Sequence, residues 1–332
     1  MSEVVTLGEC LVTLVAGRPG PLADATSFDR FVAGAEANVA VGLVRLGHAV
    51  TYIGRVGNDG FGEAIRRQLR GEGVDTAFLT TEPAAPNGLM IREHPGLVPA
   101  QVLYYRRDSA GSRVSAADVD AAVRRGAFAD ARWVHVTGIT PALSAGACAA
   151  VERAIAAGRE MGATISLDVN LRRRLWSDET AAPVLRDLAS RVDVLFGSAD
   201  ELAVLAGRPI DGGDDPADLA RATLDLGPAV TVAKLGAAGA LAIERDGTAT
   251  LRCEAIPLAF VVDPVGAGDA FCAGFIASRL EGGSVAEALE VANACGAVVA
   301  SALGDQGGLP DRATVEAVRR STGGGAGPDT VR

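Results

Sequence analysis

The sequence predicts an α/β fold in which a mostly parallel central sheet carries a small additional β-sheet. The first observation is that strand-like and helix-like apolar patterns alternate along most of the chain, which is typical of parallel sheets covered on both faces. The second is that three short strand-like segments interrupt this alternation. The chain has 332 residues, of which 48% are hydrophobic and 22% charged. This composition suits one large domain with a sizeable core.

The alternation begins near the N-terminus and indicates where a ligand should bind. An apolar run at 4–7 predicts the first strand, and residues 36–46 show the apolar periodicity of a helix. Ligands of such folds bind at the carboxyl ends of the parallel strands, so functional groups are expected directly after each strand. The other expected elements are strands at 50–53, 133–136, 165–168, 192–196 and 230–233 and a helix at 60–70.

Three segments without helices between them form the expected small sheet. They are residues 11–15, 88–93 and 101–107, and we expect them to pair antiparallel. A sheet placed over the ends of the parallel strands would act as a lid that excludes water from a site beneath it. The expected domain spans residues 1–320. The Gly-rich end, 321–332, is predicted to be a disordered tail because it has nothing to bury.

Charge and composition exclude several functions. A formal charge of −10 and a pI near 4.9 disfavour a nucleic-acid surface, which needs a basic face. No apolar run approaches the ~18 residues of a membrane span. The opening Met1-Ser2-Glu3 lacks the basic start of a signal peptide, so we expect a cytoplasmic protein with no membrane partner. The five cysteines are not spaced as metal ligands.

The segment 263–271, Asp-Pro-Val-Gly-Ala-Gly-Asp-Ala-Phe, is the strongest candidate for a catalytic site. Gly266 and Gly268 allow the backbone N–H groups around Ala267 to converge, and the helix expected after them adds the positive end of its dipole. Such a turn binds an anion, most often phosphate. Asp269 would repel that anion unless it accepts a proton from a hydroxyl attacking the phosphate, which is the arrangement of a kinase. The simpler interpretation is an ordinary turn with Asp269 as a helix cap.

A second glycine turn follows the strand expected at 230–233. Lys234 is the only lysine of the chain and could place a point charge on a phosphate. Gly236 and Gly239 would let a nucleotide approach the backbone, although a β-hairpin leading into 240–243 explains the same residues. The chain contains neither the Gly-x-x-x-x-Gly-Lys-Ser/Thr phosphate loop nor the protein-kinase motifs, so a kinase with this sequence belongs to another group.

The segment 33–47 opens an expected helix with a small-residue turn, Ala-Gly-Ala-Glu-Ala-Asn, and places Asn38 one turn into it. Together with 263–271, this segment resembles the two signatures of the ribokinase-like (PfkB) carbohydrate kinases. The resemblance extends from Gly8 to Asp305. Within that family, further blocks are similar to the 2-keto-3-deoxygluconate kinases, namely 104–106, 109–112, 138–144 and 166–172.

The resemblance implies a fold and a reaction. The fold is the ribokinase-like three-layer sandwich with a small β-sheet lid. The reaction is the phosphorylation of the terminal (6-) hydroxyl of 2-keto-3-deoxygluconate by ATP with Mg2+, and a requirement for a monovalent cation is left open. The rival functions are a fructokinase or another neutral-sugar kinase of the family and, from a different class, a catalytically silent sensor of nucleotide or sugar. A sensor needs no base beside the anion turn, so Asp269 disfavours it.

The resemblance also implies roles for individual residues. Asp269 is the general base, and the amides of Gly266, Ala267 and Gly268 form the anion hole for the γ-phosphate. The helix dipole is expected to keep Asp269 ionised. The substrate-side positions are Gly34, Ala35, Asn38, Met90, Tyr104, Arg106, Arg172 and Asp305, and the nucleotide-side positions are Asn170, Arg172, Ser198, Lys234, Gly236, Gly239 and Asn293, with Glu201 a candidate for holding Mg2+ through water.

Two positions depart from the family pattern. The segment 198–201 reads Ser-Ala-Asp-Glu where family members often carry Asn-x-x-Glu, which leaves open how Mg2+ is held. Met90 stands where the keto-deoxygluconate kinases can carry a tyrosine. Taken alone, several candidates have simpler explanations: Tyr104 as a packing aromatic, Arg172 as part of a solvated run, Asp305 as a turn cap and Glu201 as an exposed helix residue.

The charge near the substrate predicts which sugar is bound. In many neutral-sugar members of the family the first strand leads to an aspartate, and here Thr13 stands at that place, so a carboxylate that would repel an acid substrate is expected to be absent. Tyr104, Arg106 and Arg172 could then hold a substrate carboxylate through a charge-assisted arginine contact. The exposed face of the small sheet is the expected interface of a homo-oligomer, a dimer first of all.

Overall fold

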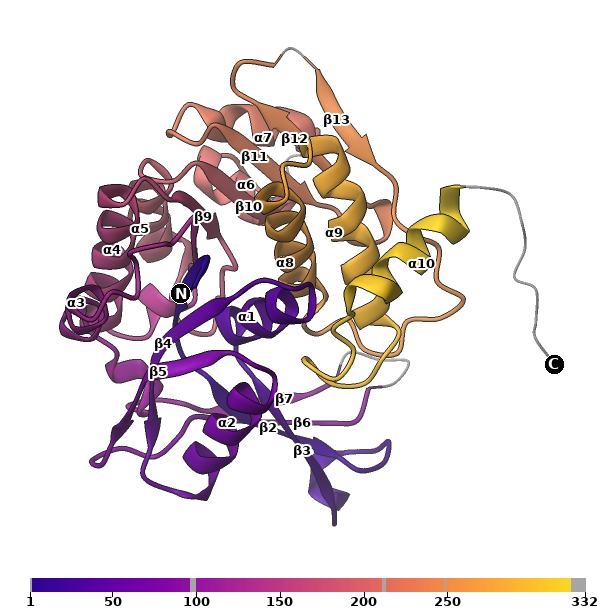
Figure 1. Cartoon of the computed structure of the whole chain (residues 1–332). Coiled ribbons are helices and arrows are strands. Elements are labelled where there is room, and N and C mark those ends of the chain that lie inside the picture. The colour runs from indigo at the N-terminus through magenta and orange to yellow at the C-terminus, as the bar shows by residue number, and fades with distance from the viewer. Residues whose placement is uncertain (1, 96–99, 211–212, 248, 324–332) are drawn as a thin grey trace.

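The computed structural model describes residues 2–95, 100–210, 213–247 and 249–323. In this part of the chain nine strands form one large sheet (Figure 1). Seven neighbouring strands run parallel, and the two strands that come last in the chain form an antiparallel edge. In spatial order they are β13 (Thr250–Cys253), β12 (Ala240–Glu244), β11 (Val230–Lys234), β10 (Val194–Ser198), β9 (Thr164–Asp168), β8 (Trp133–Thr137), β1 (Val4–Leu7), β4 (Val50–Gly57) and β5 (Asp75–Glu82).

Side chains alternate between the two faces of this sheet, and each face has its own core. Val4 on β1 packs into one core and its neighbour Val5 into the other. Helices cover both cores, which confirms the predicted three-layer α/β arrangement. The Val4 face is covered by α1 (Ala35–Arg45), α2 (Gly60–Gly71), α8 (Ala267–Leu280), α9 (Val285–Ala300) and α10 (Arg312–Gly323), and the Val5 face by α3 (Ala116–Arg124), α4 (Ala145–Glu160), α5 (Asp178–Ala189), α6 (Ala199–Ala206) and α7 (Pro216–Leu224).

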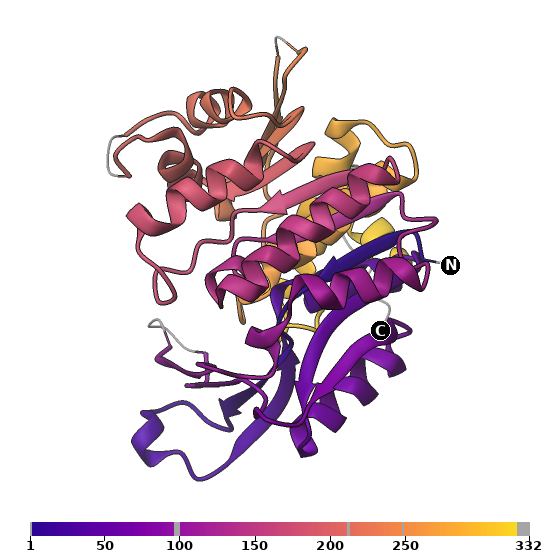
Figure 2. The same cartoon turned by 90° about the vertical axis from the view of Figure 1, so that its left-hand side faces the viewer.

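A separate small sheet lies at one end of the molecule, as Figures 1 and 2 both show. Its four strands within the described residues are, in order, β3 (Phe28–Ala33), β2 (Leu11–Ala16), β6 (Leu89–Arg92) and β7 (Val102–Tyr105). The predicted small sheet is confirmed, but it is mixed, because β2 pairs parallel with β6. The sequence pattern also misses β3, since the first half of that strand is exposed and lacks buried alternation.

Most element boundaries lie within a few residues of those expected. β4 runs beyond the predicted 50–53, and β10 begins two residues later than predicted. α10 ends at Gly323, so the first three residues of the predicted tail are helical, and 324–332 lie outside the described residues. None of the described helices is long and apolar enough to cross a membrane. Short 3-10 turns occur at Leu22–Asp24, Gly111–Arg113, Thr140–Ala142 and Gly236–Ala238.

Helices α8 and α9 pack closely at Gly274. A Cβ atom added there would lie 2.8 Å from Sγ of Cys295 and 3.0 Å from Cα of Ala292, both on α9. Because α8 begins at the 263–271 turn, this contact helps to set the position of the turn relative to the rest of the sandwich.

We expect Gly274→Ala to lower the free energy of unfolding by about 1–3 kcal/mol, because the added methyl group overpacks the α8–α9 contact. Urea denaturation followed by circular dichroism measures the change. Gly71→Ala is the matched control, since a Cβ on this helical glycine would have no heavy atom within 4 Å. It should be neutral or stabilising by up to ~1 kcal/mol. Equal stabilities of the two variants would contradict the close contact.

Candidate active site

A cleft of about 460 Å³ lies where the carboxyl ends of the parallel strands meet the small sheet. Polar side chains gather there, as expected for this class of fold. Of the predicted residues, the cleft is lined by Gly34, Ala35, Asn38, Met90, Tyr104, Arg106, Asn170, Arg172, Ser198, Glu201, Lys234, Gly266, Gly268, Asp269 and Asp305, and it is also lined by Glu9, Glu36, Arg92 and Asp168, which no sequence pattern singled out as site residues.

The turn before α8 has the geometry of an anion site. Gly266 is the N-cap residue with φ of 83°, and a Cβ there would lie 2.9 Å from the backbone oxygen of Asp305, so glycine is required. Within the described residues, the N–H groups of Gly268 and Asp269 have no backbone acceptor, whereas that of Ala267 donates to a carbonyl of the turn at 3.3 Å. The expected anion hole therefore differs at Ala267, and the next two amides of the helix start are available.

Asp269 lies on the first turn of α8 and accepts a hydrogen bond from Nδ2 of Asn38 at 2.8 Å. Desolvation by the surrounding protein raises the pKa of Asp269 to about 7. Asn38 lowers this pKa, Asp168 raises it, and Lys234 and Arg172 lower it without cancelling the desolvation. The structure thus differs from the expectation that the helix dipole keeps Asp269 fully ionised. A pKa near neutrality suits a general base.

Lys234 holds a fixed positive charge beside the same turn. Its Nζ, at the end of β11, donates to both carboxylate oxygens of Asp168, at the end of β9, at 2.7 Å. Burial lowers the pKa of Lys234, but Asp168 and the other nearby acidic groups together raise it by more, so the amine stays protonated. A Cβ added to Gly268 would lie 3.6 Å from this Nζ. The charge is therefore placed where a phosphate at the anion turn would meet it.

A buried ion pair joins the small sheet to the turn. The guanidinium of Arg92, at the end of β6, contacts both carboxylate oxygens of Asp263, and the two side chains are 3% and 1% exposed. Asp263 also accepts hydrogen bonds from the N–H of Val265 at 3.2 Å and of Gly304 at 3.3 Å. The ion pair thus fixes the small sheet, the anion turn and the segment before Asp305 to one another.

The substrate side of the cleft contains carboxylates, contrary to the expectation drawn from Thr13. Thr13 is fully buried and does not line the cleft, whereas Glu9 does. Glu9 accepts hydrogen bonds from Nε of Arg106 at 2.8 Å and from the hydroxyl of Ser109. Arg106 is therefore already paired with a buried carboxylate, and the expectation that it is free to bind a substrate carboxylate is wrong for this structure.

Two more buried carboxyl groups face the substrate side. Glu36 accepts hydrogen bonds from the hydroxyls of Thr137 at 2.7 Å and Thr140 at 2.6 Å, and burial raises its pKa. Desolvation raises the pKa of Asp305 to about 6, and its Oδ1 has no hydrogen-bond partner within the described residues. Asp305 is thus a buried carboxyl group that lines the cleft with one oxygen unpaired.

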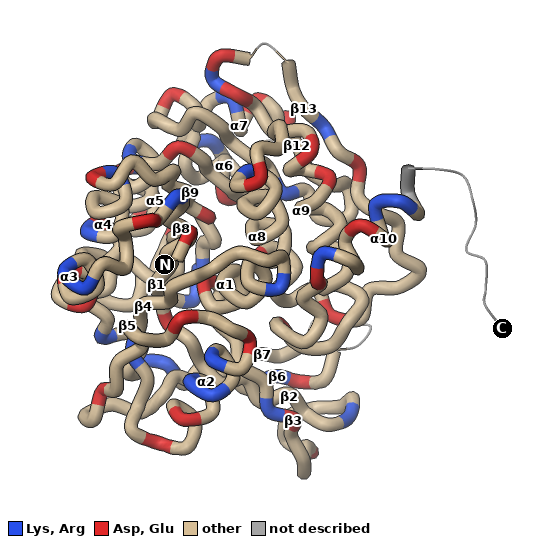
Figure 3. Tube along the Cα trace, viewed as in Figure 1, with Lys and Arg blue, Asp and Glu red and all other residues tan. Residues whose placement is uncertain are grey.

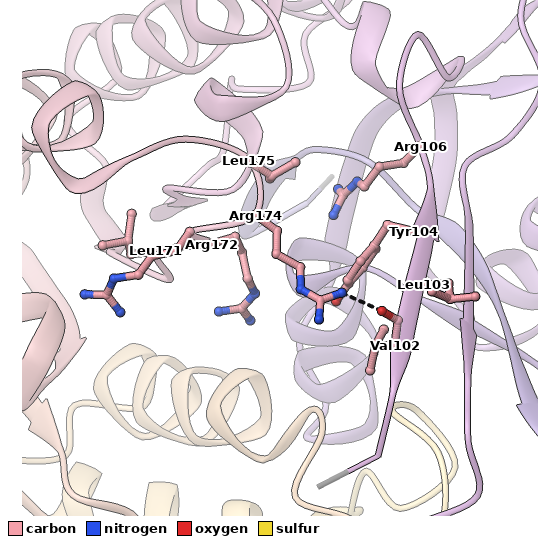
Figure 4. A pocket seen from close by; sticks show the side chains of 9 residues that line it. Val102, Leu103, Tyr104, Arg106, Leu171, Arg172, Arg174 and Leu175 are labelled. Carbon is pink, nitrogen blue, oxygen red and sulfur yellow. Dashed lines mark hydrogen bonds between the residues drawn. The ribbon is translucent and has the colours of Figure 1, made fainter. Parts of the chain in front are cut away.

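Arg172 is the guanidinium that remains available. Within the described residues its side chain forms no hydrogen bond or ion pair, and it lines both the cleft and an adjoining cavity of about 540 Å³. Figure 4 shows this cavity, with Arg174 reaching across to the backbone oxygen of Val102 on β7. Arg106 and Arg174 each lie 5.9 Å from the ring centre of Tyr104. The lining of this cavity includes Arg106, Arg172, Arg173 and Arg174 and no acidic residue among those described. On α3 and α10, by contrast, residues of both charges lie side by side (Figure 3).

Three predicted nucleotide residues lie outside the cleft. Gly236 and Gly239 belong to the turn between β11 and β12. These two strands pair antiparallel, as the hairpin interpretation requires. A Cβ on Gly239 would meet the backbone oxygen of Cys253 at 2.1 Å, whereas Gly236 faces open space. Asn293 on α9 donates to the backbone oxygens of Cys253 at 3.2 Å and Glu254 at 3.1 Å. Gly239 therefore has no room for a side chain, and the amide of Asn293 is bound to the backbone, while Gly236 faces open space. Nucleotide contacts of these three residues stay predictions.

The predicted metal residue, Glu201, caps α6. Its carboxylate accepts hydrogen bonds from the N–H groups of Ser198 and Leu171, both at 2.8 Å. Asn170, next to Leu171, has a left-handed φ of 39°, a conformation that is rare outside glycine and frequent at functional sites. Within the described residues, no group of three or more His, Cys, Asp or Glu side chains could hold a metal. A metal bound here would take most of its ligands from water and phosphate, as Mg2+ does.

Comparison with known proteins places this site in a family. A family model described as pfkB family carbohydrate kinase matches residues 1–312. The chain belongs to this family. A 2-dehydro-3-deoxygluconokinase of Thermoproteus tenax is 38% identical over 93% of this chain and 92% of that protein. A Bacillus subtilis (strain 168) enzyme of the same name is 36% identical over 93% of each chain. An E. coli protein described as a ribokinase II, solved in complex with ATP and Mg2+, has a TM-score of 0.86 at 26% identity and covers 96% of this chain and 99% of its own.

The PfkB assignment confirms the resemblance found in the sequence, the α/β fold with a separate small sheet, and carbohydrate kinase activity. PfkB kinases use ATP with Mg2+. The site fits ATP, because the free helix amides and Lys234 suit phosphate oxygens. Mg2+ would be held there mainly by phosphate and water, with Glu201 and the other carboxylates of the cleft nearby.

We expect Arg92→Met to lower the free energy of unfolding by about 3–5 kcal/mol, because it leaves the carboxylate of Asp263 buried without its partner. The double variant Arg92→Met/Asp263→Asn should recover part of this loss, since the amide removes the charge and keeps an oxygen for the nearby N–H groups. Urea denaturation measures both variants.

Arg132→Met is the control for the loss of an arginine. Arg132 pairs with Glu3, but its side chain is 55% exposed, so the change should cost no more than about 1 kcal/mol. A loss as small as this in Arg92→Met would show that the Arg92–Asp263 pair does not hold the two sheets together.

Proposed function

We propose that this PfkB kinase transfers the γ-phosphoryl group of ATP to the terminal (6-) hydroxyl of 2-keto-3-deoxygluconate, also named 2-dehydro-3-deoxygluconate. The observation that carries the proposal is the placement of the Asp269 carboxylate, the free amides of the α8 start and the charge of Lys234 around one cleft. The choice of sugar is supported by the names of the relatives at 38% and 36% identity and by the unpaired Arg172.

In the proposed reaction the sugar hydroxyl oxygen attacks the γ-phosphorus in line with the oxygen that joins it to ADP. The new O–P bond forms while the bond to ADP breaks, and ADP leaves with that electron pair. Asp269 accepts the hydroxyl proton and later returns it to solvent. The first amides of α8 and Lys234 stabilise the negative charge on the transferring group. Mg2+ bound with ATP would neutralise charge on the phosphate oxygens.

On the sugar side, we assign the substrate carboxylate to Arg172. A charge-assisted arginine contact is favourable in a site from which water is excluded. The hydroxyls are then left to Asp305, whose Oδ1 is free, and to Asn38. Gly34, Ala35, Met90, Tyr104 and Arg106 shape the wall around the sugar, and Asn170, Ser198 and Gly236 are proposed contacts of the nucleotide.

We propose that the small sheet acts as a lid and that its outer face is a dimer interface. Arg174 already bridges from the loop after β9 to the backbone of Val102 on β7, which would hold the sheet over the cleft. Phe28 is 40% exposed and Tyr105 is 61% exposed, and these two side chains mark apolar surface on the sheet that a second copy could cover.

We expect Asp269→Asn to reduce kcat by about 10²-fold or more while ATP affinity and thermal unfolding stay near those of the wild type, because the change is isosteric and removes only the proton acceptor. In the wild type, kcat/KM for the sugar should fall as the pH is lowered through about 7, since the protonated carboxyl cannot accept a proton. A coupled assay of ADP formation and calorimetric titration with ATP measure these effects. An Asn variant that keeps most of its kcat would remove Asp269 from the role of base.

Arg172→Ala should reduce kcat/KM for 2-keto-3-deoxygluconate at least tenfold and change that for fructose much less, because only the acid offers a carboxylate to this guanidinium. The assay compares both sugars, and 2-keto-3-deoxygalactonate as the epimer, in the wild type and the variant. The KM for ATP should stay unchanged.

Arg173→Ala is the matched control, since Arg173 is the next residue of the loop and pairs with Asp178 at 2.9 Å rather than lining the cleft. This variant should leave the ratio of kcat/KM for 2-keto-3-deoxygluconate to kcat/KM for fructose unchanged. If the wild type prefers fructose, the neutral-sugar kinase takes the place of this proposal. If Arg172→Ala instead raises the KM for ATP with both sugars affected alike, Arg172 belongs to the nucleotide side.

A further inference from the structure

A row of three side-chain amides connects the proposed base to the far side of α1. Nε2 of Gln68 donates to Oε1 of Gln306 at 2.7 Å, Nε2 of Gln306 donates to Oδ1 of Asn38 at 3.2 Å, and Nδ2 of Asn38 donates to Oδ2 of Asp269 at 2.8 Å. Gln306 and Asn38 are 3% and 1% exposed. The four residues come from α2, the segment after α9, α1 and α8, so the row ties together parts of the chain that are distant in sequence.

The hydrogen bonds of this row all point the same way. An ionised carboxylate only accepts hydrogen bonds, so Asp269 requires the NH2 group of Asn38 rather than its oxygen. The oxygen of Asn38 then faces Gln306 and requires a donor there, and the oxygen of Gln306 in turn requires a donor from Gln68. Each amide thus fixes the rotation of the next, and hydrogen bonds in such a chain polarise one another.

We propose that Gln306, supported by Gln68, is a positioning residue that keeps the NH2 group of Asn38 turned toward Asp269 and so favours the ionised form of the base. Neither glutamine lines the cleft. Their outer end instead borders a small cavity of about 120 Å³ behind the site, which Gln68 and Gln306 share with Arg45 and Glu72. The inference rests on the proposed role of Asp269 as the base.

Other groups near Asp269 act on its ionisation independently of this row. Asp168 and Lys234 face it from the ends of β9 and β11, Arg172 faces it from the loop after β9, and Cys272 follows it on α8. None of these side chains bonds to Gln306 or Gln68 within the described residues. Asp305, the residue before Gln306, is a further buried carboxyl group beside Asn38, and its pKa is raised to about 6 by desolvation. A change at Gln306 can therefore reach Asp269 through Asn38, through Asp305 or through a general loss of structure. Gln306→Met adds no charge next to Asp305, so it is compared with Gln306→Glu below.

The direct test uses nuclear magnetic resonance of protein labelled with ¹⁵N only at glutamine. The chain has three glutamines, Gln68, Gln101 and Gln306, so three side-chain amide signals are expected, and Gln101 is an internal control outside the row. In the wild type the Gln306 signal should shift with pH in a step at the ionisation of Asp269, and this step should disappear in Asp269→Asn, whereas a step from the neighbouring Asp305 would remain. A Gln306 signal that does not titrate, or that titrates equally in Asp269→Asn, would overturn the proposal.

The kinetic test changes the polarity of the row. In Gln306→Glu the new carboxylate attracts the NH2 group of Asn38, which turns the oxygen of Asn38 toward Asp269. The acid limb of the pH profile, meaning the fall of kcat/KM at low pH, should then have its midpoint about one pH unit higher. Gln306→Met removes the bond without reversing it and should move the limb by less. Gln101→Met is the matched control and should leave the limb in place.

The outcomes separate this inference from the proposed reaction. A purely structural role of Gln306 would lower stability or kcat but leave the midpoint of the acid limb unchanged, and that result would overturn the inference. If Asp269→Asn is inactive while Gln306→Glu keeps the wild-type limb, the positioning role fails and the base remains. If Asp269→Asn keeps its turnover, the proposed base fails and the inference fails with it.

Discussion

The structure depends on the neutralisation of buried carboxylates around the cleft. A protein with a formal charge of −10 has to admit the phosphates of ATP to a site lined by its own acidic side chains. Each isolated carboxylate would oppose this and would be costly to bury. Three of them are paired with a cation of the protein, so their charge does not oppose a phosphate, while the helix amides, Lys234 and Arg172 face the cleft. The pairs are Arg106–Glu9, Lys234–Asp168 and Arg92–Asp263.

The large sheet could be predicted because its strands are continuous apolar runs bounded by helix-length segments, a pattern that buried parallel strands require. The 4–7 and 165–168 segments are examples. The small sheet was harder to predict in detail, since an exposed strand such as β3 owes its pairing to β2 and not to its own composition. The parallel pairing of β2 with β6 likewise depends on the path of the chain between them, which no local pattern shows.

The anion turn and Asp269 could be predicted because glycine geometry and a helix start are local features. The ion pairs could not, since Arg92 and Asp263 are far apart in sequence and meet only in the folded chain. Two signals were present for missed residues: Glu9 follows the first buried strand, and Asp168 ends another, where ligand-facing side chains are expected. Arg172 is unpaired because the nearby carboxylates bind other cations of the fold, such as Arg92 and Arg106. The sequence alone does not show which arginines form ion pairs.

The use of a single lysine has a practical consequence. Amine-directed reagents find only one side-chain amino group in the whole chain, and it lies in the cleft with 17% exposure, paired to Asp168. Acylating reagents attack a neutral amine, and the pairing with Asp168 holds this one protonated, so Lys234 should react slowly. Amine chemistry that spreads over dozens of surface lysines in most proteins would therefore leave the side chains of this protein almost unmodified.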